Sequence, residues 1–237
     1  MVQQLERLEL LIGKEGIETL KQKTILIVGV GGVGGYVAES LARCGIGKLI
    51  LMDHDVVSLT NLNRQIIATY DSIGQYKTEL MKQRIQQFSG TQVECINAFF
   101  NEDTALIDCD YVVDCIDTIT SKMDIIKKCH DAKIPCISSL GMANRFDPSL
   151  LRYTTLDKTS YDPLAKAMRK MAKERNYRFK IEVVVSLEQA YKQNKLVNPD
   201  GKTYKEKYPP GSNSFVPASA GLLLGSIVVR NLLKKGN

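Results

Sequence analysis

The stretch TILIVGVGGVGG, residues 24–35, decides the fold of this chain. A short apolar run ends in glycines, and a helical pattern follows it through residues 37–44. GVGGVG fits the spacing G-x-G-x-x-G directly after a strand and before a helix, the context that this motif requires. Glycines in such a turn let the backbone approach a phosphate group, and the helix amino terminus adds a positive dipole. The stretch therefore predicts a nucleotide-binding turn, although a tight turn without a ligand would use the same glycines.

Strand and helix patterns alternate on both sides of this turn. Apolar runs predict the strands, and stretches of helical periodicity predict the connections between them. The predicted strands are 24–29, 48–53, 93–99, 111–117 and 135–141, and the predicted helices are 37–44, 77–88 and 121–133. Parallel strands with crossover helices form an α/β fold with a Rossmann-like, doubly wound, mainly parallel sheet.

The pattern changes after residue 141. A charged helix (162–176), a strand (180–187) and an apolar helix (217–233) predict a smaller α+β extension. We expect the last helix to pack back on the first half. The chain then divides into a nucleotide-binding part, 1–141, and an extension, 142–237, joined in one integrated domain.

Composition narrows the class of protein. Of 237 residues, 44% are hydrophobic and 24% are charged, which allows a real core, and the net charge of +6 favours an anionic partner. The amino terminus lacks the apolar core of a signal peptide, and prolines and polar residues interrupt 208–229. We therefore expect a cytoplasmic protein without membrane insertion. Six cysteines form no C-x-x-C pair, so no four-cysteine zinc site is expected.

Polar residues follow the predicted strands. Asp53 ends the second strand, where a carboxylate can bind ribose hydroxyls. Arg64 and Lys77 come next, and a triphosphate needs such cations to neutralise its charge. Asp117 ends a later strand, with Lys122 beyond it, and an acid there can hold the Mg²⁺ that accompanies ATP. Each could be an ordinary surface charge, but their convergence on one sheet edge favours ATP.

The motifs resemble those of the adenylating domain of ubiquitin-activating-type enzymes and their bacterial relatives ThiF and MoeB. The matching elements, in order, are GVGGVGG (29–35), Asp53 and Asp55, TNLNRQ (60–65), GQYK (74–77) and DCIDT (114–118). The resemblance spans residues 5–141 and implies that ATP activates a carboxylate as an acyl-adenylate. Positioning and charge neutralisation drive that step, so no protein nucleophile is required.

The resemblance also implies site residues. Those expected to bind the nucleotide are Gly29, Gly31, Gly32, Gly34, Asp53, Asn61, Arg64, Gln65, Lys77 and Asp117. Arg64, Lys77 and Asp117 would act in catalysis, and Asp117 would ligate Mg²⁺. Arg7 resembles the arginine that this family sends across a dimer interface into the neighbouring site, which implies a homodimer. An arginine in an amino-terminal helix is more often a solvated charge.

The second half of the chain carries a basic stretch. Residues 158–208 contain 13 Lys and Arg against 6 Asp and Glu, a net charge of +7, with five interleaved tyrosines and Phe179. Basic side chains beside aromatic rings suit an RNA backbone and unstacked bases. The residues expected to contact tRNA are Arg169, Lys170, Lys173 and Arg175. A solvated helix face is the simpler explanation of such a stretch taken alone.

Within the family, the chain resembles the TcdA (CsdL) group. The similar stretches are RLELLIGKEGIETL (7–20), SLARCGIGKLILMD (40–53), TNLNRQIIA (60–68) and FDPSLLRYTTLDKTSYDPLAKAMRK (146–170). The resemblance implies ATP-dependent dehydration of threonylcarbamoyladenosine in tRNA to a cyclic form, through adenylation of its threonyl carboxylate. It leaves a cysteine desulfurase or sulfur acceptor open as a partner, although SNSFVPASA (212–220) stands where some members carry a cysteine.

Three alternatives remain at this point. An adenylyltransferase for the carboxyl-terminal glycine of a ubiquitin-like sulfur carrier would share the ATP site, but its relatives commonly hold zinc through cysteine pairs that this chain lacks. A dinucleotide-dependent oxidoreductase would leave Arg64, Lys77 and Asp117 unexplained. A non-catalytic RNA-binding module would account for the basic stretch alone.

Overall fold

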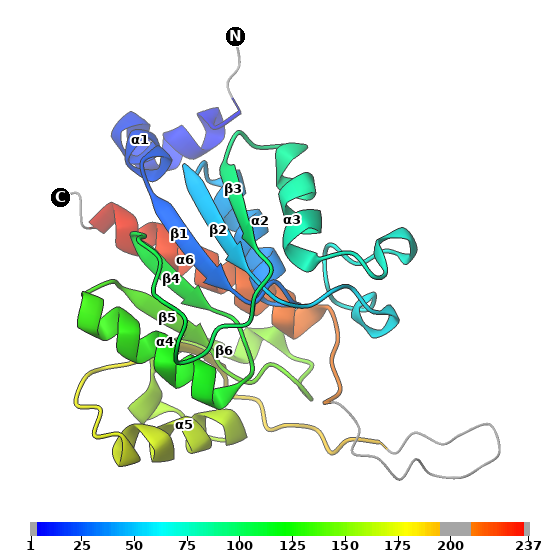
Figure 1. Ribbon diagram of the computed structural model, residues 1–237, viewed down its shortest axis with the longest axis vertical. Helices are drawn as coiled ribbons and strands as arrows, with labels where there is room; N and C mark the ends of the chain where they lie inside the picture. Colours follow the sequence, from blue (N-terminus) through cyan, green and yellow to red (C-terminus); the bar gives the residue numbers. More distant parts are fainter. Residues whose placement is uncertain (1–3, 195–209, 235–237) are drawn as a thin grey trace.

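The computed structural model describes residues 4–194 and 210–234, whose strands form one sheet in the order β3-β2-β1-β4-β5-β7-β6 (Figure 1). The strands are β1 (Thr24–Val28), β2 (Lys48–Met52), β3 (Gln92–Ile96), β4 (Tyr111–Asp114), β5 (Cys136–Ser139), β6 (Leu151–Thr155) and β7 (Glu182–Ser186). The α-helices are α1 (Glu6–Lys21), α2 (Gly34–Arg43), α3 (Lys77–Gln86), α4 (Ile119–Ala132), α5 (Pro163–Glu174) and α6 (Phe215–Lys234). The predicted doubly wound α/β fold is confirmed.

The strand order reverses at β1. From there the chain adds β2 and β3 on one side, then returns to place β4, β5 and β7 on the other, with every one of these pairs parallel. β6 runs antiparallel to β7 at the edge of the sheet and was not predicted. Only its first residue, Leu151, is buried, because an edge strand needs no continuous apolar run. The extension thus shares one sheet with the first half.

Alternate residues of β1 pack into two different hydrophobic clusters. Ile25 and Ile27 join the cluster formed with α2 and α6, whereas Leu26 and Val28 join the cluster that includes Ile125 of α4. All four are buried. A central parallel strand is covered on both faces, so its sequence is apolar throughout, as the run TILIV shows.

The last helix, α6, packs against α2, as predicted. The interruptions in 208–229 were expected to prevent membrane insertion, yet by length and composition this helix could cross a membrane. Within the protein, 56% of its most apolar window is buried. Contact with α2 is close at Gly221, where an added Cβ would lie 2.5 Å from the carbonyl oxygen of Val33 and 2.7 Å from the Cβ of Tyr36. The small residue therefore sets how near α6 comes to the start of α2.

We predict that Gly221→Ala destabilises the protein by about 1–3 kcal/mol, because the added methyl group overpacks the α2–α6 contact. Helix propensity alone would favour alanine by up to about 1 kcal/mol. A net decrease in the free energy of unfolding would therefore be due to the overpacked contact. Urea denaturation measures the free energy of unfolding. Gly90→Ala is the matched control, since a Cβ there would meet nothing within 4 Å. Equal stability of Gly221→Ala and wild type would contradict the prediction.

Candidate functional site

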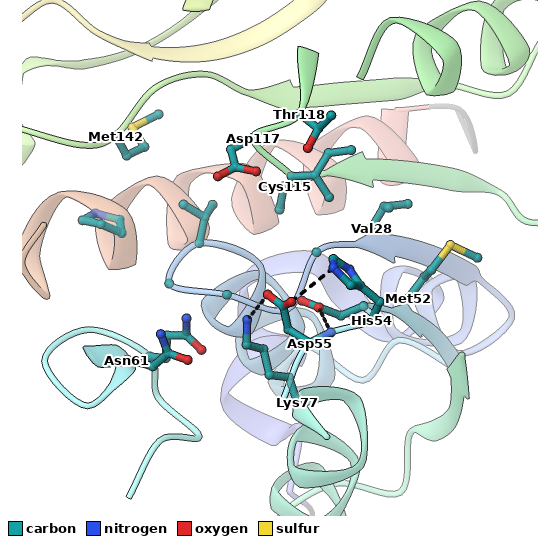
Figure 2. A pocket seen from close by; sticks show the side chains of 18 of the residues that line it. Val28, Met52, His54, Asp55, Asn61, Lys77, Cys115, Asp117, Thr118 and Met142 are labelled. Atoms are coloured by element: carbon teal, nitrogen blue, oxygen red, sulfur yellow. Dashed lines mark hydrogen bonds and ion pairs between the residues drawn. The ribbon is translucent and has the colours of Figure 1, made fainter. Parts of the chain in front are cut away.

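A cleft of about 330 Å³ opens at the carboxyl ends of β1, β2 and β4 (Figure 2). It lies where the strand order reverses, which is where ligands bind in open α/β sheets. The predicted site residues that line it are Gly29, Gly31, Gly32, Asp53, Asn61, Arg64, Gln65, Lys77 and Asp117. Gly34 and Arg7 are not part of the lining. Residues far apart in the sequence therefore meet in one place.

The glycines of the turn after β1 have different tasks. Gly29 has a φ of +91°, and a Cβ on it would lie 2.9 Å from the backbone carbon of Cys115, so glycine permits the loop after β4 to pack against this turn. A Cβ on Gly34 would lie 1.8 Å from the carbonyl oxygen of Gly29. Gly34 thus lets α2 begin close to β1. Gly31 and Gly32 face the cleft, with backbone that a ligand can approach.

Asp53 follows β2 and organises the wall of the cleft. Its Oδ2 accepts a hydrogen bond from the backbone N–H of Val30 (2.7 Å), and its Oδ1 accepts one from the N–H of Asp55 (2.8 Å). These bonds tie the glycine turn to the loop after β2. Each carboxylate oxygen keeps a further lone pair, which a ribose hydroxyl can use as an acceptor.

The segment between β2 and α3 folds back on itself and brings Lys77 to the cleft. The N–H of Val57 donates to the carbonyl of Gln75 (2.9 Å), and the N–H of Lys77 donates to the carbonyl of Asp55 (3.2 Å). Lys77 Nζ lies 2.7 Å from Asp55 Oδ2. Burial opposes ionisation of Asp55, but its hydrogen bond to Lys77 and the charges of Lys77 and His54 outweigh burial and lower its pKa.

Sequence reasoning did not identify His54 as part of the site. Its Nε2 lies 3.2 Å from Asp55 Oδ1, and its ring packs edge-on against Phe99 at 5.1 Å between centroids. The ligand atoms of Asp53, His54 and Asp55 lie within 4.8 Å of one another, as in a metal site. The Lys77 ammonium already contacts Asp55 and competes with a metal ion there. The signal for these residues was the run of polar side chains directly after β2.

Arg64 contributes a second cation, from the turn that follows the short 3₁₀ helix Leu59–Asn61. Its Nη1 donates to the carbonyl of Thr60 (2.8 Å) and to Asn63 Oδ1 (3.0 Å), which are both neutral. Among the described residues no carboxylate forms an ion pair with Arg64, and partial burial lowers its pKa. A partly desolvated guanidinium that faces a cleft without an acid beside it favours an anionic ligand.

Two of the three amide side chains of NLNRQ, those of Asn61 and Gln65, are more buried than Arg64. Asn61 Oδ1 accepts a hydrogen bond from the N–H of Ser58 (3.1 Å), which caps the short helix and fixes the start of the motif. Gln65 lies beside Gly31, and its Oε1 is buried without a hydrogen-bond partner among the described residues. Both amides therefore line the cleft from a rigid turn.

Asp117 faces Lys77 across the cleft in Figure 2. Asp117 was predicted to end a strand, but β4 stops at Asp114 and Asp117 lies in the loop before α4. Its carboxylate is exposed, and no described side chain forms an ion pair with it. Lys122, expected near the ligand, is instead fully buried, with Nζ 2.9 Å from Asp114 Oδ2. Only the acid of that predicted pair lines the cleft.

Cys115 is the cysteine of the cleft lining. Burial, and then the negative charge of Asp114, raise the pKa of its thiol. The thiol therefore stays protonated at neutral pH and is a poor nucleophile. The described part of the cleft thus presents cations, acids and backbone amides rather than an activated nucleophile.

Arg7 lies on α1 and does not line the cleft; in Figure 1 this helix lies at the end of the sheet where β1 begins. Arg7 is exposed, so within one chain it does not join the residues predicted with it. Leu10 and Leu11 on the same helix are 84% and 82% exposed. The helix therefore presents apolar side chains outward beside Arg7.

The predicted tRNA contacts on α5 differ in their availability. Arg169 was expected to contact tRNA, and its Nη1 donates to the carbonyl of Thr159 (3.0 Å), which holds the segment before the helix. Arg175 pairs with Asp124 of α4. Lys170 lies 3.7 Å from Glu174 on the surface, and Lys173 is exposed. Residues 195–208 of the basic stretch lie outside the described residues.

This arrangement suits an anionic, phosphorylated ligand. Two cations, Arg64 and Lys77, and the amides after β1 can neutralise phosphate oxygens, while Asp53 can bind a hydroxyl group. Asp117, free of a described cation, fits the oxygen ligand that Mg²⁺ prefers. The geometry supports a reaction at a phosphate group of a bound nucleotide.

Comparison with known proteins agrees with this geometry. The sequence profile of the ThiF family matches residues 3–235. The chain is 41% identical to the tRNA threonylcarbamoyladenosine dehydratase of Bacillus subtilis over 244 aligned positions, covering 99% of this chain and 96% of that protein. It is 38% identical to the Escherichia coli dehydratase over 168 positions, covering 69% and 63%.

A solved structure also matches over nearly the whole chain. The crystal structure of the E. coli tRNA N6-threonylcarbamoyladenosine dehydratase, TcdA, in complex with ATP is 31% identical, with a TM-score of 0.87 and coverage of 98% of this chain and 95% of that one. An AMP complex of the same enzyme matches with a TM-score of 0.85. The chain belongs to the ThiF family, in the group that contains the tRNA threonylcarbamoyladenosine dehydratases.

Proposed function

We propose that this chain uses ATP to dehydrate threonylcarbamoyladenosine in tRNA to its cyclic form, through an adenylate of the threonyl carboxylate. The observation that carries the proposal is the convergence of Arg64, Lys77 and Asp117 on the glycine turn in one cleft. An oxidoreductase would not need these charges. Similarity to tRNA dehydratases along almost the whole chain supports the choice of substrate.

The reaction needs positioning and charge neutralisation. An oxygen of the threonyl carboxylate attacks the α-phosphorus of ATP, and the bond to pyrophosphate breaks. Lys77 and Arg64 stabilise the negative charge that develops on the phosphates. The carbamoyl group of the same nucleoside then attacks the acyl carbon, and AMP leaves. The protonated Cys115 takes no part as a nucleophile, which agrees with an intramolecular capture.

Asp117 is the residue that would hold Mg²⁺ beside the phosphates, and the ion would supply further neutralisation of phosphate charge. The support for this role is its exposed carboxylate, which lines the cleft opposite Lys77. Asp55 is a weaker choice because Lys77 already binds it.

A homodimer is part of the proposal. Arg7 is exposed and outside the cleft of its own chain, so it can reach a phosphate most readily from a second subunit. The exposed Leu10 and Leu11 beside it provide apolar surface that a partner would cover. Two copies that each pack this helix against the other would form a symmetric interface.

The tRNA surface is proposed to include the outer face of α5. Lys166, Lys170 and Lys173 are exposed and spaced by one or two helical turns, so they share a face. Arg169 donates to the carbonyl of Thr159 and Arg175 pairs with Asp124, so the proposal places the main contact on the three lysines.

We predict that Lys77→Ala and Arg64→Ala each reduce formation of the cyclic nucleoside at least a hundredfold, since removing one such donor costs about 3 kcal/mol of transition-state stabilisation. Mass spectrometry of nucleosides from tRNA incubated with ATP measures the product. Lys82→Ala, a lysine of α3 outside the cleft lining, is the control. Wild-type turnover by either folded variant would contradict the role of that residue. Adenylation of a sulfur-carrier tail, without change in tRNA, would favour the alternative function.

A second prediction concerns the dimer. Mixtures of Arg7→Ala and Lys77→Ala proteins should recover activity that neither has alone, because some hybrid dimers contain one intact composite site. The assay is product formation against mixing ratio. Sedimentation showing monomers under turnover conditions would contradict the shared site.

A third prediction concerns α5. Lys173→Glu should weaken tRNA binding and reduce the slope of log affinity against log salt by about 1, as expected when one phosphate contact is lost. Filter binding over a salt series measures the slope. Lys21→Glu, which changes an exposed lysine of α1, should bind tRNA as wild type does. An unchanged slope in Lys173→Glu would remove α5 from the tRNA surface.

A further inference from the structure

The loop that carries Asp117 is held by a buried charged side chain. β4 ends at Asp114, which pairs with Val28 of β1 and Ser138 of β5, and α4 begins at Ile119. Between them, the N–H of Ile116, the residue before Asp117, donates to Asp114 Oδ1 at 3.2 Å. The position of Asp117 therefore depends on the orientation of the Asp114 carboxylate.

That carboxylate is itself fixed from two other elements. Lys122, on the first turn of α4, places Nζ 2.9 Å from Asp114 Oδ2, and Ser138 Oγ donates to the same oxygen. The N–H of Lys122 also donates to the carbonyl of Thr118, directly after Asp117. The Asp114 carboxylate therefore contacts the loop at Ile116, and the first helical bond of α4 closes its other side. The carboxylate ties the loop to α4 and β5.

Burial of the Asp114–Lys122 ion pair costs free energy, because both charged groups lose their hydration. Lys122 and Asp114 both have 0% side-chain exposure. The attraction between two buried charges barely offsets the free energy lost on desolvation. A protein with well-packed apolar residues in their place is therefore often at least as stable. Neither residue lines the cleft. Stability alone therefore does not account for the pair.

We propose that the Asp114–Lys122 ion pair, with Ser138, is a positioning device that aims the Asp117 carboxylate into the nucleotide cleft. The inference rests on the proposed function, because it assigns Asp117 to the magnesium–ATP complex. Asp114 and Lys122 touch neither ligand nor reacting atoms. They act by fixing the backbone at Ile116, directly before Asp117, and by joining that point to the first turn of α4, as groups behind a metal ligand commonly do.

The test uses the full chain without tRNA and measures the ATP dissociation constant with Mg²⁺ and with EDTA. Wild type should bind ATP more tightly with Mg²⁺, and Asp117→Asn should lose most of that gain. Asp114→Asn should reduce the gain about tenfold. The double variant should be no worse than Asp117→Asn alone, because a residue that acts through another gives non-additive effects.

Glu39→Gln is the matched control. Glu39 is a buried carboxylate on α2, paired with Arg43 and Arg84, and it does not line the cleft. This variant should lower the melting temperature and leave the magnesium gain as in wild type. The same gain in Asp114→Asn, measured well below its melting temperature, would overturn the proposal, as would additive losses in the double variant.

Ser138→Ala serves if Asp114→Asn does not fold. It removes one hydrogen bond to Asp114 and keeps the ion pair, so a partial loss of the magnesium gain is expected and an unchanged gain overturns the proposal. Because these measurements need no tRNA, they are separable from the proposed reaction. A wild-type protein that binds magnesium–ATP but leaves threonylcarbamoyladenosine unchanged would refute the reaction and leave the positioning role standing.

Discussion

The parallel pairing of β1 with β4 is the interaction on which the rest of the structure depends. β1 sends the chain toward β2 and β3, whereas β4 sends it toward β5 and β7. The loops at their carboxyl ends therefore diverge and leave a crevice. The pairing is tight because Gly29 lacks a side chain where the loop after β4 passes. A larger residue would separate the turn that approaches phosphate from the loop that carries Asp117.

Charge is distributed unevenly around this crevice. Lys77 is already paired with Asp55, so its ammonium is held in place before a ligand arrives, at little cost in side-chain entropy. Arg64 has only neutral partners and is partly desolvated, so it gains most from a bound phosphate. One cation is thus preorganised, and the other depends on the ligand for its counter-charge. Such a pair can bind a triphosphate and can also stabilise the negative charge that develops on the phosphates during the reaction.

The extension after residue 141 does not form a separate body. β7 pairs with β5 and carries the sheet onward, and α6 packs on α2, whose first residues follow the glycine turn. Pro217 of α6 and Met142 both line the cleft. The carboxyl-terminal half therefore closes the nucleotide site as well as carrying the basic surface. A change in the packing of α6 would therefore shift the start of α2 and, with it, the glycine turn.

The sequence by itself determined the parallel strands of the sheet and four charged residues of the cleft. Apolar runs and the glycine turn predicted the parallel strands, and the motifs brought Asp53, Arg64, Lys77 and Asp117 to one edge, because the carboxyl ends of parallel strands must meet there. Only the tertiary structure decided which charges are free. Lys122 was expected near the ligand and Arg169 at tRNA, yet one is buried against Asp114 and the other holds the segment before α5. Periodicity reports which face of an element is apolar, whereas the partner of a charged side chain depends on elements brought together from distant parts of the chain. For the same reason β6 escaped prediction, since an edge strand is defined by the neighbour with which it pairs.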